Sequence, residues 1–101
     1  DMNIDELNIS NVSQRESAYF TNVFYITFEI DGFGYSMFIK QAADGLIHPQ
    51  SIDHLIQNGT CKYCKNRSTL CPVLNDYKKE LFHRLIDFPS IPLEWLYIDH
   101  V

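Results

Sequence analysis

The first clear pattern in the chain is an alternation of apolar and polar side chains between Tyr19 and Gln41. One face of the first run carries Phe24, Ile26, Phe28 and Ile30, and one face of the second carries Tyr35, Met37 and Ile39. This period of two is typical of half-buried strands. Two glycines, Gly32 and Gly34, lie between the runs and permit the positive φ that a tight turn needs. The pattern therefore predicts a β-hairpin with arms over 19–30 and 35–41.

The second half of the chain changes period. Ser51 can cap a short helix that ends at Asn58-Gly59, and Pro72 stands at the first position of a longer helix. Apolar residues at spacings of three and four continue this second helix to Ile86. Residues 93–101 alternate again, which predicts a third strand that pairs with the hairpin.

These elements predict an α+β domain over residues 18–101. We expect a small antiparallel sheet, made of the hairpin and the C-terminal strand, with one long helix over one face and one short helix beside it. Residues 1–17 show no sustained period of 2 or 3.6, so we expect a loosely ordered lead-in there.

Composition narrows the class of protein. The 101 residues are 46% hydrophobic and 21% charged, which is the balance of one globular domain. A net charge of -5 speaks against non-specific binding of nucleic acid or of an anionic membrane. No apolar run approaches the ~20 residues of a membrane span, and we expect a soluble cytoplasmic protein.

Candidate chemistry is concentrated in the three cysteines. Cys61, Cys64 and Cys71 form a C-x2-C-x6-C pattern, and Pro72 follows the last of them. A C-x2-C turn brings two sulfurs close together, and a six-residue loop can return a third, as zinc and iron–sulfur sites require. The spacing favours a structural zinc ion. An iron–sulfur centre, a disulfide or thiol switch, and plain buried thiols are the alternatives.

A histidine can supply the fourth ligand. His54 lies seven residues before Cys61 and is the first candidate, and His48 is the second. His83 is about 18 Å along the predicted helix from Cys71, which makes it a poor partner. His100, in the predicted last strand, cannot be judged from spacing.

The surroundings of the cysteines are basic. Six of the eight Lys and Arg residues fall between residues 61 and 84. Nearby cations lower a thiol pKa, which serves a metal ligand and a redox-active cysteine equally. We expect a partner-binding contact on the loop at Lys62, Tyr63, Lys65 and Arg67.

The order of hairpin, C-x2-C loop and Cys-Pro helix start resembles small bacterial domains that share a CxxC followed by a Cys-Pro at a helix start. The resemblance covers roughly residues 23–101. It implies the same architecture and a cysteine-centred role, and it names no activity.

The sequence thus favours a small, non-enzymatic zinc-binding module that contacts a protein partner through a basic loop. No signature ties a base to any of the cysteines, which speaks against an enzyme. Two alternatives stay open: an acidic inhibitor or immunity-type protein that binds a basic partner, and an iron–sulfur or thiol redox protein.

Overall fold

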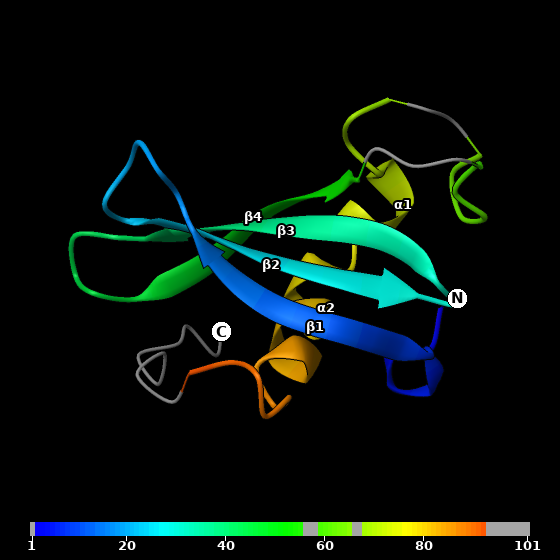
Figure 1. The fold of residues 1–101 in the computed structure, drawn as a ribbon, viewed down its shortest axis with the longest axis horizontal. Helices are drawn as coiled ribbons and strands as arrows, with labels where there is room; N and C mark the ends of the chain where they lie inside the picture. Colours follow the sequence, from blue (N-terminus) through cyan, green and yellow to red (C-terminus); the bar gives the residue numbers. More distant parts are fainter. Residues whose placement is uncertain (1, 56–58, 66–67, 93–101) are drawn as a thin grey trace.

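The computed structural model describes residues 2–55, 59–65 and 68–92. In these residues a four-stranded antiparallel sheet precedes two helices, so the predicted α+β class is confirmed (Figure 1). The sheet order is β1-β2-β3-β4, and each strand pairs with the next one along the chain. In chain order the elements are the 3-10 turn η1 (Ile4–Glu6), β1 (Ile9–Glu16), β2 (Val23–Ile30), β3 (Phe33–Gln41), β4 (Ile47–His54), α1 (Pro72–Asn75) and α2 (Lys78–Leu85).

The predicted hairpin is confirmed as β2 and β3. The two strands pair without interruption from Val23 opposite Lys40 to Ile30 opposite Phe33. Asp31 and Gly32 form the turn, with φ values of 51° and 83°. A two-residue turn with positive φ at both positions follows the right-handed twist of the strands.

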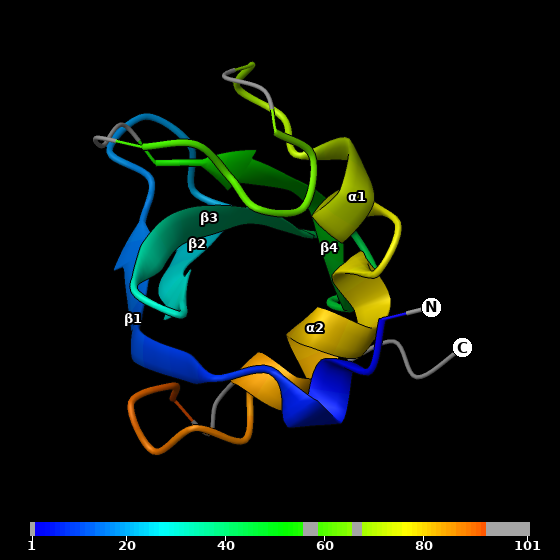
Figure 2. The same ribbon diagram turned by 90° about the vertical axis from the view of Figure 1, so that its right-hand side faces the viewer.

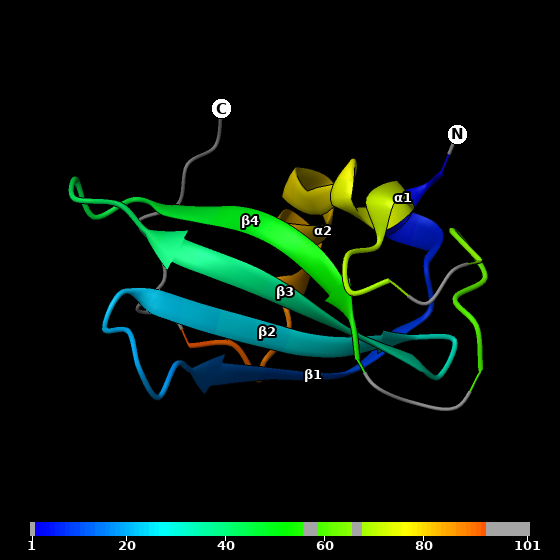
Figure 3. The same ribbon diagram turned by 90° about the horizontal axis from the view of Figure 1, so that it is seen from above.

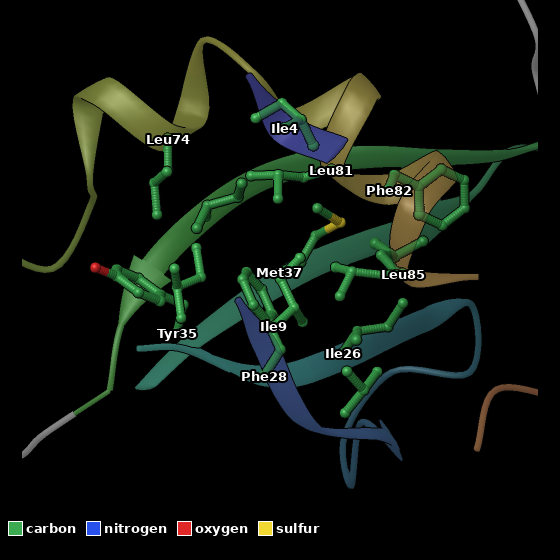
Figure 4. Packing of buried hydrophobic residues seen from close by; sticks show 14 of the residues in the cluster. Ile4, Ile9, Ile26, Phe28, Tyr35, Met37, Leu74, Leu81, Phe82 and Leu85 are labelled. Carbon is green, nitrogen blue, oxygen red and sulfur yellow. The ribbon is translucent and has the colours of Figure 1, made fainter. Parts of the chain in front are cut away.

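The core lies on the concave face of the sheet. Figure 2 shows the sheet curled from β1 to β4, with α2 across the open side. Three α2 side chains, Leu81, Phe82 and Leu85, are buried, and they face inward-pointing strand residues such as Ile26 and Met37 (Figure 4). Because neighbouring strands are also neighbours in sequence, this core is built mostly from consecutive segments (Figure 3).

The expectation of a loosely ordered lead-in over residues 1–17 is wrong, because η1 and β1 lie there. β1 pairs with β2 and buries Ile9 and Val12. Its register shifts between Ser10 and Ser13, and Asn11 has a φ of 52°. This bulge places the two buried residues three positions apart, which hides the period of two in the sequence.

The predicted short helix after Ser51 is also wrong, since β4 continues to His54. Ile52 is fully buried opposite Met37. The cross-strand pairing with β3 thus overrides a local capping signal. Residues 56–58, which include the predicted end of that helix, lie outside the described residues.

The single long helix predicted from Pro72 to Ile86 is two helices. Tyr77 separates α1 from α2 with φ −109° and ψ 18°, and its N–H bonds to the Leu74 carbonyl three residues earlier. The spacing of apolar residues is almost the same across this break, so the sequence pattern did not reveal it. The predicted strand over 93–101 lies outside the described residues; β1 and β4 form the edges of the observed sheet.

Candidate metal centre

Four side chains meet at one end of the sheet. They are those of His54, Cys61, Cys64 and Cys71, and one ligand atom from each lies within 4.8 Å of all the others. His54 ends β4, Cys71 is the N-cap of α1, and the other two lie between them. We call residues 55–71 the cysteine segment. The four residues expected from spacing are therefore brought together.

Backbone hydrogen bonds explain how the last cysteine reaches His54. The chain returning to α1 runs antiparallel to the end of β4, with an isolated bridge between Asp53 and Leu70. The His54 N–H donates to the Thr69 carbonyl at 2.7 Å, and the Cys71 N–H donates to the Ile52 carbonyl at 2.9 Å. These bonds place Cys71 beside β4.

The C-x2-C turn is fixed by its own backbone. The Lys65 N–H donates to the Cys61 carbonyl at 2.9 Å, and Lys65 adopts a left-handed φ of 57°. Cys61 is buried and Cys64 is half-buried. The turn therefore points one sulfur into the protein and holds the second nearer to solvent.

The distances between the four ligand atoms suit an ion with tetrahedral coordination. Cys61 Sγ lies 3.9 Å from Cys71 Sγ, and Cys64 Sγ lies 3.3 Å from His54 Nε2. Zinc–sulfur bonds of ~2.3 Å imply sulfur–sulfur edges of about 3.8 Å in a tetrahedron. All three cysteines are free thiols. The donor set is thus compatible with metal binding, and three thiolates with one imidazole suit zinc.

The orientation of His54 agrees with ligation through one ring nitrogen. Its Nδ1 lies 2.6 Å from the Ser68 carbonyl oxygen, which can only accept a hydrogen bond. Nδ1 must therefore carry the proton, and Nε2, which faces Cys64, keeps its lone pair. Metal-binding histidines commonly show this arrangement, in which a carbonyl fixes the tautomer.

Tyr35 supports the cluster from the core. Its ring is fully buried, and its hydroxyl lies 3.1 Å from Cys61 Sγ. Figure 4 shows the hydroxyl pointing away from the apolar packing. Burial raises the pKa of Tyr35, so this hydroxyl keeps its proton and can donate it to the sulfur. Sequence reasoning missed this contact, although Tyr35 occupies an inward position of a strand.

The two buried thiols differ in acidity. Burial alone would raise the pKa of Cys61, but hydrogen bonds from the Tyr35 hydroxyl and from backbone N–H groups of the C-x2-C turn lower it. Burial raises the pKa of Cys71, and the neighbouring Cys61 sulfur adds to this effect. Cys61 is therefore the more acidic thiol of this pair.

The other histidines considered as ligands are not in the cluster as far as the structure describes them. His48 lies near the start of β4, opposite Lys40. His83 is on α2, against Phe82. His100 lies outside the described residues. The structure thus selects His54 over His48.

The basic loop is partly engaged within the chain. Lys62 forms an exposed ion pair with Asp31 in the hairpin turn, and its ammonium lies 5.3 Å from the centre of the Tyr63 ring. Tyr63 is half-buried and packs against the core, Lys65 is exposed, and Arg67 lies outside the described residues. Their predicted role as a partner contact stays a prediction.

No family model, curated protein or solved structure matches this chain. Among the described residues, no helix has the length and apolar character needed to cross a lipid bilayer.

Proposed function

We propose that His54, Cys61, Cys64 and Cys71 hold a zinc ion, and that the protein is a small, non-enzymatic interaction module built around it. In this proposal zinc supplies a cross-link between β4, the cysteine segment and α1. It would add folding free energy to a domain whose core is small.

The observation that carries the proposal is the Nδ1 hydrogen bond of His54. A histidine that merely fills space beside three thiols has no need of a fixed tautomer. Here Nδ1 bonds to the Ser68 carbonyl, and Nε2 lies within hydrogen-bonding distance of Cys64 Sγ, at 3.3 Å. Four protein ligands fill a tetrahedral shell, and a filled shell is typical of structural zinc rather than catalytic zinc.

A partner-binding role is supported by apolar exposure beside the cluster. Leu55 is 40% exposed and Leu70 is 41% exposed, and each lies one residue from a proposed ligand. Zinc would fix the backbone on which both leucines sit. Loops held in this way present side chains to a partner at a low cost in conformational entropy.

The test is the metal content of protein purified without added metal, compared between two histidine variants. His54→Asn removes the proposed ligand, and His48→Asn is the matched control in the same strand. We expect one zinc per chain in the parent and the control, and a large loss in His54→Asn. Cobalt added to the metal-free protein should give the visible spectrum of a tetrahedral thiolate site in the same two proteins.

Equal zinc in the two variants would contradict His54 as a ligand. Iron in place of zinc, with the brown colour of a cluster, would support the iron–sulfur alternative. Absence of metal in all three proteins, with no uptake of cobalt, would overturn the proposal.

A further inference from the structure

A groove runs between the N-terminal segment and the helices, away from the four proposed ligands. Two hollows of about 460 and 430 Å³ share Met2 and Tyr77 as lining residues and therefore adjoin. Tyr63 and Val73 line the first, and the η1 turn and Glu80 line the second. Figure 3 shows the N-terminal segment beside α1 and α2.

The walls of the groove are aromatic and apolar. Tyr63 comes from the C-x2-C turn, Tyr77 from the break between α1 and α2, and Met2 and Val73 lie close to both. The Tyr63 hydroxyl is buried and, among the described residues, has no hydrogen-bond partner. The Tyr77 hydroxyl accepts a hydrogen bond from the Met2 N–H at 3.3 Å. Two tyrosines thus line one opening.

The charged lining of the groove is acidic. Asp5 and Glu80 are the charged side chains among the described residues that line the two hollows, and both are exposed. The nearby cations contact other groups: Lys62 pairs with Asp31 and lies 5.3 Å from the centre of the Tyr63 ring, and Arg84 donates to the Ile4 carbonyl. The groove therefore combines aromatic faces with unneutralised carboxylates.

We infer that this groove binds an arginine side chain of a basic segment in a partner protein. A guanidinium is planar, stacks on tyrosine rings and pairs with carboxylates through a fork of N–H donors. Lysine, whose compact ammonium neither stacks in this way nor forms a fork, serves such a groove less well. The charge of the groove also complements a basic segment, which aids encounter.

This inference gives the proposed module a class of partner, a protein segment that contains arginine. It rests on the proposed zinc only for the position of Tyr63. Val73 and Tyr77 belong to the helical region, which also packs on the sheet through buried apolar residues such as Leu74 and Leu81. Binding at the groove and metal content can therefore be measured on the same sample and can fail separately.

The test is a nuclear magnetic resonance titration of isotope-labelled protein with the capped peptide Gly-Ala-Arg-Ala-Gly, and with its Lys and Gln counterparts. We expect saturable shifts at Met2, Tyr63, Val73 and Tyr77 with the arginine peptide, weaker shifts with the lysine peptide, and none with the glutamine peptide. The double variant Asp5→Asn, Glu80→Gln should raise the dissociation constant about fivefold, as the loss of two exposed ion pairs predicts.

The matched control is Glu16→Gln with Asp44→Asn, which removes the same charge at the end of β1 and between β3 and β4, at two residues that line neither hollow. It should change the dissociation constant less than about twofold. Equal weakening in both variants, shifts that map outside the groove, or no binding of the arginine peptide would each overturn the inference. If the purified protein holds no zinc and still binds the arginine peptide, the binding would support the groove, and the missing metal would count against the metal proposal alone.

Discussion

The β2–β3 hairpin and the cysteine segment are stabilised by different kinds of contact. The hairpin pairs eight residues on each strand and buries side chains on every second position. The described part of the cysteine segment has only the isolated bridge at Leu70 and contributes two buried residues, Cys61 and Cys71. The hairpin is stabilised by strand pairing and apolar burial, and the cysteine segment by a few backbone hydrogen bonds and by contacts at its sulfur atoms.

This difference shows which information each region needs in order to fold. The hairpin uses alternation, a two-residue turn and cross-strand packing, all encoded within residues 23–41. The cysteine segment must find His54 on β4 and the Tyr35 hydroxyl in the core. We therefore propose that the structure of the cysteine segment depends on the sheet, and that the sheet can form without it.

The largest effect should come from the hairpin. Phe28 is 1% exposed and stacks on Tyr35 with ring centres 5.7 Å apart. Phe28→Ala should lower the free energy of unfolding by about 3–5 kcal/mol because it removes a large buried ring and leaves a cavity. Chemical denaturation checks this. A decrease in the free energy of unfolding of less than about 1 kcal/mol would mean that burial in the hairpin contributes little to the stability of the core.

Removal of metal should act mainly on the cysteine segment. With zinc at a hundred times its dissociation constant, a chelator should lower the free energy of unfolding by about 2.7 kcal/mol. Hydrogen exchange should accelerate at the amides of Lys65 and Cys71, while amides of β2 and β3 stay protected. Uniform acceleration across both regions would contradict the proposed independence of the sheet.

Tyr35→Phe should have an intermediate effect, because it removes only the hydroxyl that connects the two regions. Loss of one buried hydrogen bond to a sulfur should cost about 1 kcal/mol of stability. Loss of this support for a ligand should weaken metal affinity by about 10-fold or more. Tyr25→Leu, on the outer face of the same hairpin, is the control and should leave metal affinity unchanged. Equal affinity in Tyr35→Phe and the parent would show that the hydroxyl does not act on the cluster.

The smallest effect is expected from Lys62→Met. The pair of Lys62 with Asp31 joins the cysteine segment to the hairpin turn, but both side chains are well exposed. The pair lowers the pKa of Asp31, chiefly through the Lys62 hydrogen bond, so any stabilisation is present above the normal Asp pKa and is lost as pH falls. We expect a thermal midpoint close to that of the parent, with even less difference in high salt. A marked drop at neutral pH would reveal that this surface contact orders the segment.

The same contrast explains what the sequence could predict. The hairpin followed from alternation because burial alternates regularly from Ile26 to Ile30 and from Tyr35 to Ile39. The spacing of the cysteines indicated a shared site, and seven residues of separation made His54 a candidate. β1 was missed because the bulge at Asn11 breaks its period of two. β4 was missed because Ser51, which lies within it, is a residue typical of helix caps and was interpreted as one.

The support around the cluster could not be predicted for a different reason. The Ser68 carbonyl and the Tyr35 hydroxyl reach His54 and Cys61 from distant parts of the chain. Neither contact leaves a local pattern, since any residue can offer a carbonyl and tyrosine is common in strands. Only the three-dimensional path of the cysteine segment shows them.

The sequential pairing of the four strands also has a consequence in time. Each strand needs only its immediate neighbour in the chain, and topologies of such local contacts fold fast. During synthesis all four strands, which end at His54, leave the ribosome before the first cysteine does. We therefore expect the newly made protein to pass through a species with a formed sheet and unliganded thiols. The cellular supply of metal would then decide how long that species lasts.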